Sequence, residues 1–369
     1  MSGRAVRLLH IADVHLERPF SRMAPEVGAR RRALLRASFE RAITLASEMR
    51  VDALCVAGDL FERDSATVEI GEFLRGLFAR LHPIPVLIAP GNHDFYRPGC
   101  LYDRVSWSDN VHVFRSHAAT EITVADGLVV GAAFTTAKDD GWLSLPRAAS
   151  DRPRVGLFHA DLVEGRTVES RYRPVRRQDL HDAGLAFALL GHWHSALLDR
   201  EGRAAYTGSL EPLDRTECGE RWVHLLTVDS AGATSEVVPI AVSSVVEVAI
   251  DVTGISSAGE LVREIERRID GHADDFVALV LTGERTGELA LDWPAALGAV
   301  SVAVASVDDR TNALGDWQRY RSERSVRGRF VDAIASELEQ AGDDAAKRRL
   351  LDELAVGLAA LEGRQALPL

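Results

Sequence analysis

The chain has 369 residues, of which 46% are hydrophobic, and its 43 basic and 55 acidic residues leave a formal net charge of −12. This length allows one large core and a second, smaller one. The acidic balance excludes a surface coated with phosphate-binding charge, although bound divalent cations could still supply positive charge locally for DNA. No apolar run approaches the ~18 residues of a membrane span. Three cysteines without metal or redox spacing, and no N-terminal secretory segment, predict a cytoplasmic protein with no membrane association.

The first 240 residues alternate predicted strands and helices. Strands are expected at residues 8–13, 53–58, 86–89, 128–133, 155–158 and 187–190. Helices are expected at about residues 30–50 and 66–81, where Ile70, Leu74 and Leu77 belong to an apolar stripe with helical spacing. This alternation predicts an α/β fold, a layered α/β/β/α sandwich of two sheets with helices outside.

Five polar segments follow the predicted strands. They are Asp13-Val14-His15, Gly58-Asp59, Gly91-Asn92-His93-Asp94, His159-Ala160-Asp161 and Gly191-His192-Trp193-His194. On extended strands, residues two apart such as Asp13 and His15 point to the same side. Imidazoles and carboxylates at the ends of strands are suitable ligands for a divalent Lewis acid. Each segment alone has an ordinary explanation as a turn or a core residue, but seven compatible ligands together predict a metal site.

The metal-ligand chemistry stops near residue 240. Predicted strands at 246–252, 276–281 and 300–305, with a helix at 257–269, indicate a small α/β domain at residues 245–315. Residues 320–369 are expected to form amphipathic helices, because Phe330, Ile334 and Leu338 share one helical face before a break at 342–344. The apolar faces of these helices either pack on the chain itself or dock on a partner, and the sequence leaves both alternatives open.

In this order, the five segments resemble the calcineurin-like metallophosphoesterase superfamily over about residues 5–240. Within it, residues 15–20, 58–61 and 189–194 resemble the DNA-repair exonucleases of the SbcD/YhaO type. These are bacterial relatives of the recombination nuclease that partners an SMC-like ATPase. Residues 206–210 and 222–228 are similar to the strand pair that follows the last histidines in that group, and by themselves they read as a hairpin closing a sheet.

The resemblance implies two divalent metal ions, with Mn²⁺ as the expected metal. The first ion would be held by Asp13, His15 and His194, the second by Asn92, His159 and His192, and Asp59 would bridge them. Two cations that share a carboxylate clamp the attacking and leaving oxygens of an in-line displacement, and they lower the pKa of bound water.

The resemblance also implies catalytic roles for His93 and Asp94. His93 would contact the scissile phosphate and protonate the leaving oxygen, with Asp94 orienting its ring. For Asp94 the alternative is a turn cap that bonds nearby amides. Archaeal and eukaryotic members of the group carry a second catalytic histidine three residues after the bridging aspartate, where this chain has Glu62. The exonuclease step would therefore depend on His93 alone or on a residue elsewhere.

These features predict a two-metal-dependent DNA exonuclease or endonuclease that acts in DNA repair as the nuclease subunit of a complex with an SMC-like ATPase. Residues 1–240 would form the nuclease domain, 245–315 a capping domain or a plain packing domain, and 320–369 a partner-docking segment. A homodimer through helices of the nuclease domain is a further expectation. Arg30–Arg32 with Arg36, and Arg171–Arg177, are either DNA-binding clusters or solvated arginine faces.

Two alternatives remain for the function. One is a metallophosphoesterase that acts on a small phosphodiester, a nucleotide or a phosphoprotein, which would not require the C-terminal third of the chain. The other is a non-catalytic scaffold, which the complete ligand set and His93 disfavour.

Overall fold

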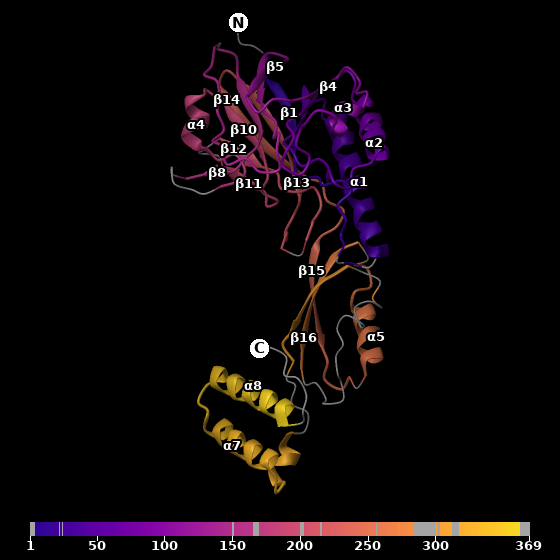
Figure 1. Cartoon of the computed structure of the whole chain (residues 1–369), viewed down its shortest axis with the longest axis vertical. Coiled ribbons are helices and arrows are strands. Elements are labelled where there is room, and N and C mark those ends of the chain that lie inside the picture. The colour runs from indigo at the N-terminus through magenta and orange to yellow at the C-terminus, as the bar shows by residue number, and fades with distance from the viewer. Residues whose placement is uncertain are drawn as a thin grey trace. The chain divides into compact units, whose positions relative to one another are not determined.

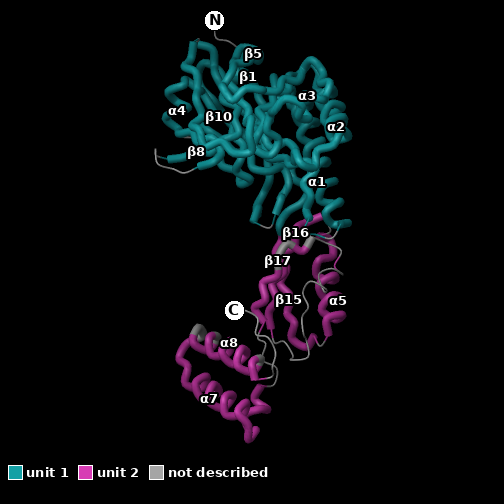
Figure 2. Tube along the Cα trace, in the orientation of Figure 1, with its two compact units in different colours: residues 1–245 teal, residues 246–369 magenta. Residues whose placement is uncertain are grey.

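The structure, a computed structural model, describes residues 4–361 apart from 22, 24, 150, 165–169, 200–202, 215, 256, 273, 284–299, 301–302 and 312–316. The chain forms two compact units, residues 1–245 and residues 246–369 (Figure 2). The expected capping domain and C-terminal helices both fall in the second unit, and part of the strand expected at 300–305 lies outside the described residues. No helix in the described part of the chain is long and apolar enough to span a membrane.

The first unit contains two six-stranded sheets, and the first has the order β14-β13-β1-β2-β3-β4. Its strands are β1 (Val6–Ile11), β2 (Ala53–Val56), β3 (Val86–Ile88), β4 (Val111–Val113), β13 (Trp222–Asp229) and β14 (Gly232–Pro239). Strands β1 to β4 run parallel, whereas β13 pairs antiparallel with both β1 and β14. The parallel strands therefore end at one edge of the sheet.

The second sheet has the order β11-β12-β10-β7-β6-β5. Its strands are β5 (Thr120–Val124), β6 (Gly127–Gly131), β7 (Arg154–His159), β10 (Phe187–Gly191), β11 (Leu197–Asp199) and β12 (Ala204–Tyr206). Two short strands, β8 (Leu162–Val163) and β9 (Val175–Arg176), form a separate pair. The hairpin expected from residues 206–228 was wrong, because β12 belongs to the second sheet and β13 to the first.

Apolar side chains pack between the two sheets and confirm the predicted α/β sandwich. Leu8 and Leu87 of the first sheet share one buried cluster with Leu157 and Leu189 of the second. The flanking helices are α1 (Pro25–Glu48), α2 (Val68–Ala79) and α3 (Leu101–Arg104) on one side and α4 (Arg177–Asp182) on the other (Figure 1). Leu180 of α4 packs on the outer face of the second sheet.

The second unit combines a small sheet with helices. Its strands, in the order β15-β16-β17, are β15 (Val245–Asp251), β16 (Phe276–Thr282) and β17 (Ala303–Asp309). Helix α5 (Ala258–Arg268) begins after Ser257, whose hydroxyl accepts a hydrogen bond from the Glu260 amide, and packs on the sheet through Leu261 and Ile265. The remaining elements are the 3₁₀ helix η1 (Trp317–Ser322), α7 (Val326–Gln340) and α8 (Asp344–Leu361).

Helices α7 and α8 cover much of each other's apolar face. Val331 and Ile334 of α7 share a buried cluster with Leu354 and Leu358 of α8. Of the two alternatives left open by the sequence, packing within the chain therefore accounts for these side chains. Among the large apolar residues of this pair, Val326 remains 73% exposed.

Two histidines face each other inside the first sheet. His10 on β1 is in register with His224 on β13, and their ring centroids lie 5.8 Å apart. Both side chains are buried, and within the described residues neither ring nitrogen of His224 has a hydrogen-bond partner. Burial lowers the pKa of His224 to about 4, and burial, together with His224, lowers the pKa of His10 well below its usual value.

This pair predicts a loss of stability in mild acid. An unfolded histidine takes up a proton near pH ~6.5, whereas His224 in the folded chain stays neutral down to about pH 4. The contribution of neutral His224 to the free energy of unfolding is therefore fully present above pH ~6.5. At pH 5, the proton uptake of this histidine in the unfolded chain lowers the free energy of unfolding by roughly 2 kcal/mol. Denaturant unfolding at pH 7 and 5 should show a smaller loss in His224→Phe than in the wild type. The exposed-site control His181→Gln should match the wild type, and an unchanged loss in His224→Phe would contradict the prediction.

Candidate metal centre

All seven predicted ligands lie at the ends of parallel strands, and both sheets of the sandwich contribute. Asp13 and His15 follow β1, Asp59 follows β2 and Asn92 follows β3, all in the first sheet; His159 ends β7, and His192 and His194 follow β10 in the second. Both sheets thus present their carboxyl edges to the same site, which is where ligands gather in α/β folds.

The loop after β1 turns in a way that the sequence did not predict. Strand β1 ends at Ile11, and Asp13 and His15 adopt left-handed backbone conformations with φ of 50° and 49°. Their amides donate to the carbonyls of Gly58 and Asp59 at 3.1 and 2.9 Å. The prediction that Asp13 and His15 point to the same side because they alternate along a strand was therefore wrong. The left-handed turns after β1 bring the two side chains together. Each such residue costs about 1–3 kcal/mol, a strain typical of functional sites.

Two glycines make room for this packing. A Cβ atom on Gly91 would lie 2.3 Å from Oδ1 of Asp59, and one on Gly191 would lie 1.9 Å from the carbonyl oxygen of Ala57. Side chains at these two positions would push the ligand loops apart. The glycines that precede Asn92 and His192 are therefore required by the close approach of the loops.

Two imidazoles are held by carboxylates so that their other nitrogens meet. His15 donates from Nδ1 to Glu62 at 2.8 Å, and His194 donates from Nδ1 to Glu217 at 2.7 Å. A neutral ring that donates from Nδ1 has a lone pair at Nε2. The two Nε2 atoms approach to 3.2 Å. Two Nε2 atoms at this distance either share a proton or face a common cation, so their convergence fits half of a metal site.

Asp59 lies between this pair and a third imidazole. Its Oδ2 is 3.6 Å from Nε2 of His15 and 3.4 Å from Nε2 of His159, and its Oδ1 accepts a hydrogen bond from the amide of His93 at 2.8 Å. One carboxylate oxygen is thus within reach of both halves of the site. This is the position expected for a bridging ligand.

The second half of the site is built around His159. Its Nδ1 donates to the Ala57 carbonyl at 2.9 Å, which leaves Nε2 facing Oδ1 of Asn92, also at 2.9 Å. The His192 ring lies beside it, with centroids 5.3 Å apart. Asp13 accepts from the amide of His192 at 3.1 Å, and its carboxylate comes within 4.8 Å of ligand atoms in both halves.

The donor set fits two divalent cations. Among the described residues, ligand atoms of Asp13, His15 and His194 lie within 4.8 Å of one another, as do those of Asp13, Asp59 and His159, and those of His15, Asp59 and His93. Burial raises the pKa of Asp13, whereas for Asp59 the neighbouring His159 and His15 outweigh burial and lower the pKa. Two buried carboxylates this close to each other gain stability from positive charge placed between them.

His93 lies at the rim of the site and is held by Glu62. Its Nδ1 donates to Oε2 of Glu62 at 2.8 Å, and this hydrogen bond raises the pKa of His93 to about 9. Asp94 does not orient the ring. Instead it accepts from the amides of Asp59, Leu60 and Gly91 and from the Tyr102 hydroxyl. The capping alternative therefore describes Asp94, because its short side chain turns back onto the loop.

Other contributors could not be assigned from spacing. Glu62 is 47 residues from its partner His15, and Glu217 is 23 residues from His194. Carboxylates that hold metal-binding imidazoles have no local sequence pattern, because they act across loops. Trp193 is likewise part of the site. Its indole is 56% exposed and donates to Asp161 at 2.6 Å, and the same Asp161 oxygen is 3.7 Å from Nε2 of His192.

One relative is similar in sequence to part of this chain. The chain is 28% identical over 242 residues to the uncharacterised metallophosphoesterase YhaO of Bacillus subtilis (strain 168), an alignment that covers 62% of this chain and 59% of that protein. The chain thus spans less than two thirds of this relative.

Two solved structures also align with part of the chain. They are TT1561 of Thermus thermophilus (14% identity, TM-score 0.38, 62% of this chain and 100% of that one) and the calcineurin-like phosphoesterase YfkN of Bacillus subtilis (11% identity, TM-score 0.40, 65% and 92%). Residues 6–196, which carry every predicted ligand, match the model of the calcineurin-like phosphoesterases. The chain belongs to the calcineurin-like phosphoesterase family.

Proposed function

We propose that this chain is a two-metal-dependent phosphodiesterase that cleaves DNA in repair, as the nuclease subunit of a complex with an SMC-like ATPase. The observation that carries the phosphodiesterase part is the 3.2 Å approach of the His15 and His194 Nε2 atoms beside Asp59, with His93 at the rim. Asp13, His15, His194 and Asp59 would hold one ion, and Asp59, Asn92, His159 and His192 the other. Such ions act as Lewis acids on the phosphate and lower the pKa of water.

His93 performs the proton transfer in this proposal. Its side chain is 42% exposed, and its Nδ1 is bonded to Glu62, whose carboxylate raises the pKa of His93 and favours the protonated ring. As water attacks phosphorus and releases a proton to solvent, the P–O bond to the leaving group breaks and its electron pair goes to the leaving oxygen. That oxygen takes the proton from Nε2 of His93, and solvent reprotonates the ring.

Trp193 supports a substrate that carries nucleobases. Its exposed indole is fixed by Asp161 beside the ligand His192, and the Tyr172 ring packs against the His192 ring, with centroids 4.3 Å apart. An exposed aromatic face next to a phosphate-cleaving site suits the stacking of a base. We therefore assign Trp193 to contact with the nucleotide that flanks the scissile phosphate.

A small phosphodiester is the second candidate substrate, and the arginines favour it. Arg31 is buried and donates to Ser243 and to the Pro212 carbonyl, and Arg36 is paired with Glu17 at 2.6 Å. Arg173 is also buried, with its guanidinium on backbone carbonyls. These three side chains are committed to the fold, so each predicted cluster offers fewer arginines to DNA than its sequence indicates, although Arg30 and Arg171 are exposed. A small substrate would need no such surface.

The first test of the proposed function concerns metal binding. Asp59→Asn removes the charge shared by the two halves of the site, so the variant should lose tight binding of one Mn²⁺ in calorimetric titration. Its phosphodiesterase rate should fall by at least about 100-fold, because the Lewis-acid contribution is worth several kcal/mol. The control is Asp109→Asn, an 86% exposed carboxylate beside His82. Wild-type binding of two ions by Asp59→Asn would exclude Asp59 as the bridge.

The choice between substrates can be tested directly. Linear duplex and single-stranded DNA are incubated with the protein and Mn²⁺ or Mg²⁺ beside bis-p-nitrophenyl phosphate. DNA degradation that disappears in Asp59→Asn and in His93→Ala is expected. If the protein hydrolyses the small diester but leaves DNA intact, even when an SMC-like ATPase is supplied, DNA is not the substrate. The second candidate, a small phosphodiester, would then be the proposed substrate.

The stacking role of Trp193 gives a third test. Trp193→Ala should raise KM for single-stranded oligonucleotides by roughly 5- to 150-fold at little cost in kcat, because stacking of one base is worth about 1–3 kcal/mol. Trp193→Phe should stay near the wild type. The matched control is Trp142→Ala, an indole that is 40% exposed and lies under Arg176. An equal effect of Trp193→Ala on an abasic oligonucleotide would argue against stacking.

A further inference from the structure

We propose that Glu62 is a positioning residue that holds two imidazoles at once, the metal-facing His15 and the proton donor His93, each through its own carboxylate oxygen. A carboxylate at this place cannot take over the role of a catalytic histidine, but it can act through two other histidines. The expected effect of Glu62 on kcat rests on the proposed phosphodiesterase function. Its expected effects on Mn²⁺ binding and on the protonation of the two rings at Nδ1 do not.

The two contacts are separate and equally short. Oε1 of Glu62 accepts from Nδ1 of His15 and Oε2 accepts from Nδ1 of His93, both at 2.8 Å. The two rings meet edge to face, with centroids 4.8 Å apart and an interplanar angle of 79°. Neither ring can rotate without breaking its bond to Glu62 or colliding with the other ring. A single side chain therefore fixes both orientations.

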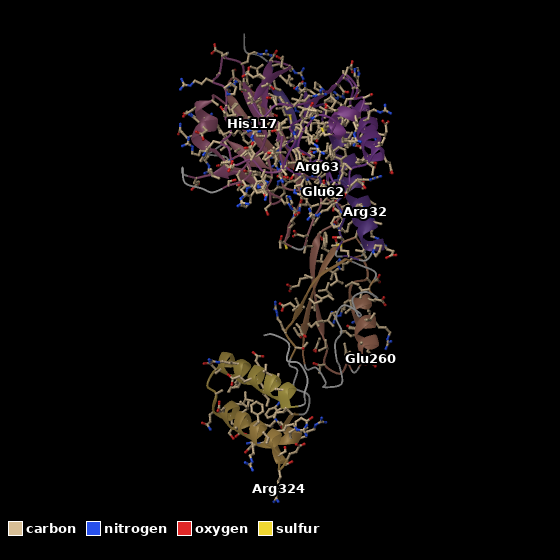
Figure 3. The ribbon with its side chains drawn as sticks, viewed as in Figure 1. Arg32, Glu62, Arg63, His117, Glu260 and Arg324 are labelled. Atoms are coloured by element: carbon tan, nitrogen blue, oxygen red, sulfur yellow. The ribbon has the colours of Figure 1, made fainter. Side chains whose placement is uncertain are left out.

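The backbone around Glu62 is attached to both loops that carry these rings. The Glu62 amide donates to the carbonyl of Leu16, next to His15, at 2.9 Å, and the Arg63 amide donates to the carbonyl of His93 at 3.2 Å. Figure 3 marks Glu62 and Arg63 in the first unit. The Glu62 side chain is only 16% exposed. Its position is thus set by main-chain hydrogen bonds, and it does not depend on the flexibility of a surface side chain.

The charge of Glu62 is suited to this task. Both of its carboxylate oxygens accept hydrogen bonds from imidazole rings, one from His15 and the other from His93. Arg18 adds positive charge on the outer side, with Nη1 3.8 Å from Oε1. An ionised carboxylate is an acceptor only, so both imidazoles must be protonated at Nδ1. In His15 this leaves the Nε2 lone pair toward His194 and Asp59, and in His93 it leaves Nε2 for the leaving oxygen.

The informative substitution is Glu62→Gln, which keeps the shape but presents one oxygen and one NH₂ group. Only one imidazole can then keep its hydrogen bond from Nδ1, and the other must rotate or change tautomer. Glu17→Gln is the control, since Glu17 is a partly buried glutamate that pairs with Arg36 outside the site. Calorimetric titration with Mn²⁺ alone should show about 10- to 100-fold weaker binding in Glu62→Gln, the usual cost of losing such a partner, and wild-type binding in the control.

The link to His93 has its own kinetic signature. At saturating Mn²⁺, Glu62→Gln should lower kcat for a diester with an alkyl leaving group at least about tenfold more than kcat for bis-p-nitrophenyl phosphate. The reason is that p-nitrophenolate leaves without a proton, whereas an alkoxide needs the proton of His93. A merely structural defect would reduce both rates equally, and equal reduction would overturn the role of Glu62 in positioning His93.

A measurement without catalysis completes the test. Long-range ¹H–¹⁵N spectra of the imidazoles in the metal-free wild type should show a proton on Nδ1 of both His15 and His93. A ring that lacks this proton would overturn the proposal even if Glu62→Gln fails to fold. If the spectra and the Mn²⁺ titration agree with the proposal while the wild type cleaves no phosphodiester, the proposed function is wrong and the positioning role of Glu62 stands.

Discussion

The site depends on one repeated interaction, a hydrogen bond from Nδ1 of an imidazole to an acceptor behind it. Glu62 accepts from His15, Glu217 accepts from His194 and the Ala57 carbonyl accepts from His159. In each case the acceptor selects the tautomer, and Nε2 is turned toward the centre of the site. Without these acceptors the rings could rotate, and no arrangement of ligands would be defined before a metal ion arrives.

This arrangement is costly in the absence of positive charge. Asp13 and Asp59 are both buried among the same imidazole rings, and both residues have left-handed backbone conformations. Asp94 is buried nearby, and burial together with Asp59 raises its pKa to about 6. Strain and buried charge of this kind persist only where the surrounding fold enforces them. A bound cation would reduce the repulsion between the buried carboxylates of Asp13 and Asp59. Metal affinity and the local stability of the site should therefore be coupled.

The substrate question is a matter of where positive charge is available. The chain is acidic overall, and its buried arginines, Arg31 and Arg173 among them, stabilise loops instead of facing solvent, so cations bound at the site would add to the attraction for phosphate. An exposed indole beside the ligands adds an uncharged way to hold a nucleotide. A nuclease with this surface would depend on a partner for long stretches of DNA, which is consistent with the proposed ATPase subunit.

The sequence by itself determined the α/β class, most strand and helix positions and the residue types available for metal binding, because apolar periodicity and polar residues at strand ends are local properties. Apolar periodicity could not show that residues 204–206 and 222–229 belong to different sheets, since strand partners are chosen by long-range packing. Only the tertiary structure decided that Glu62, and not Asp94, holds His93, that Glu217 holds His194, and that Arg31 and Arg173 are buried. These outcomes depend on loops that turn through left-handed residues and come into contact between the two sheets. The spacing of residues along the chain does not predict such long-range contacts.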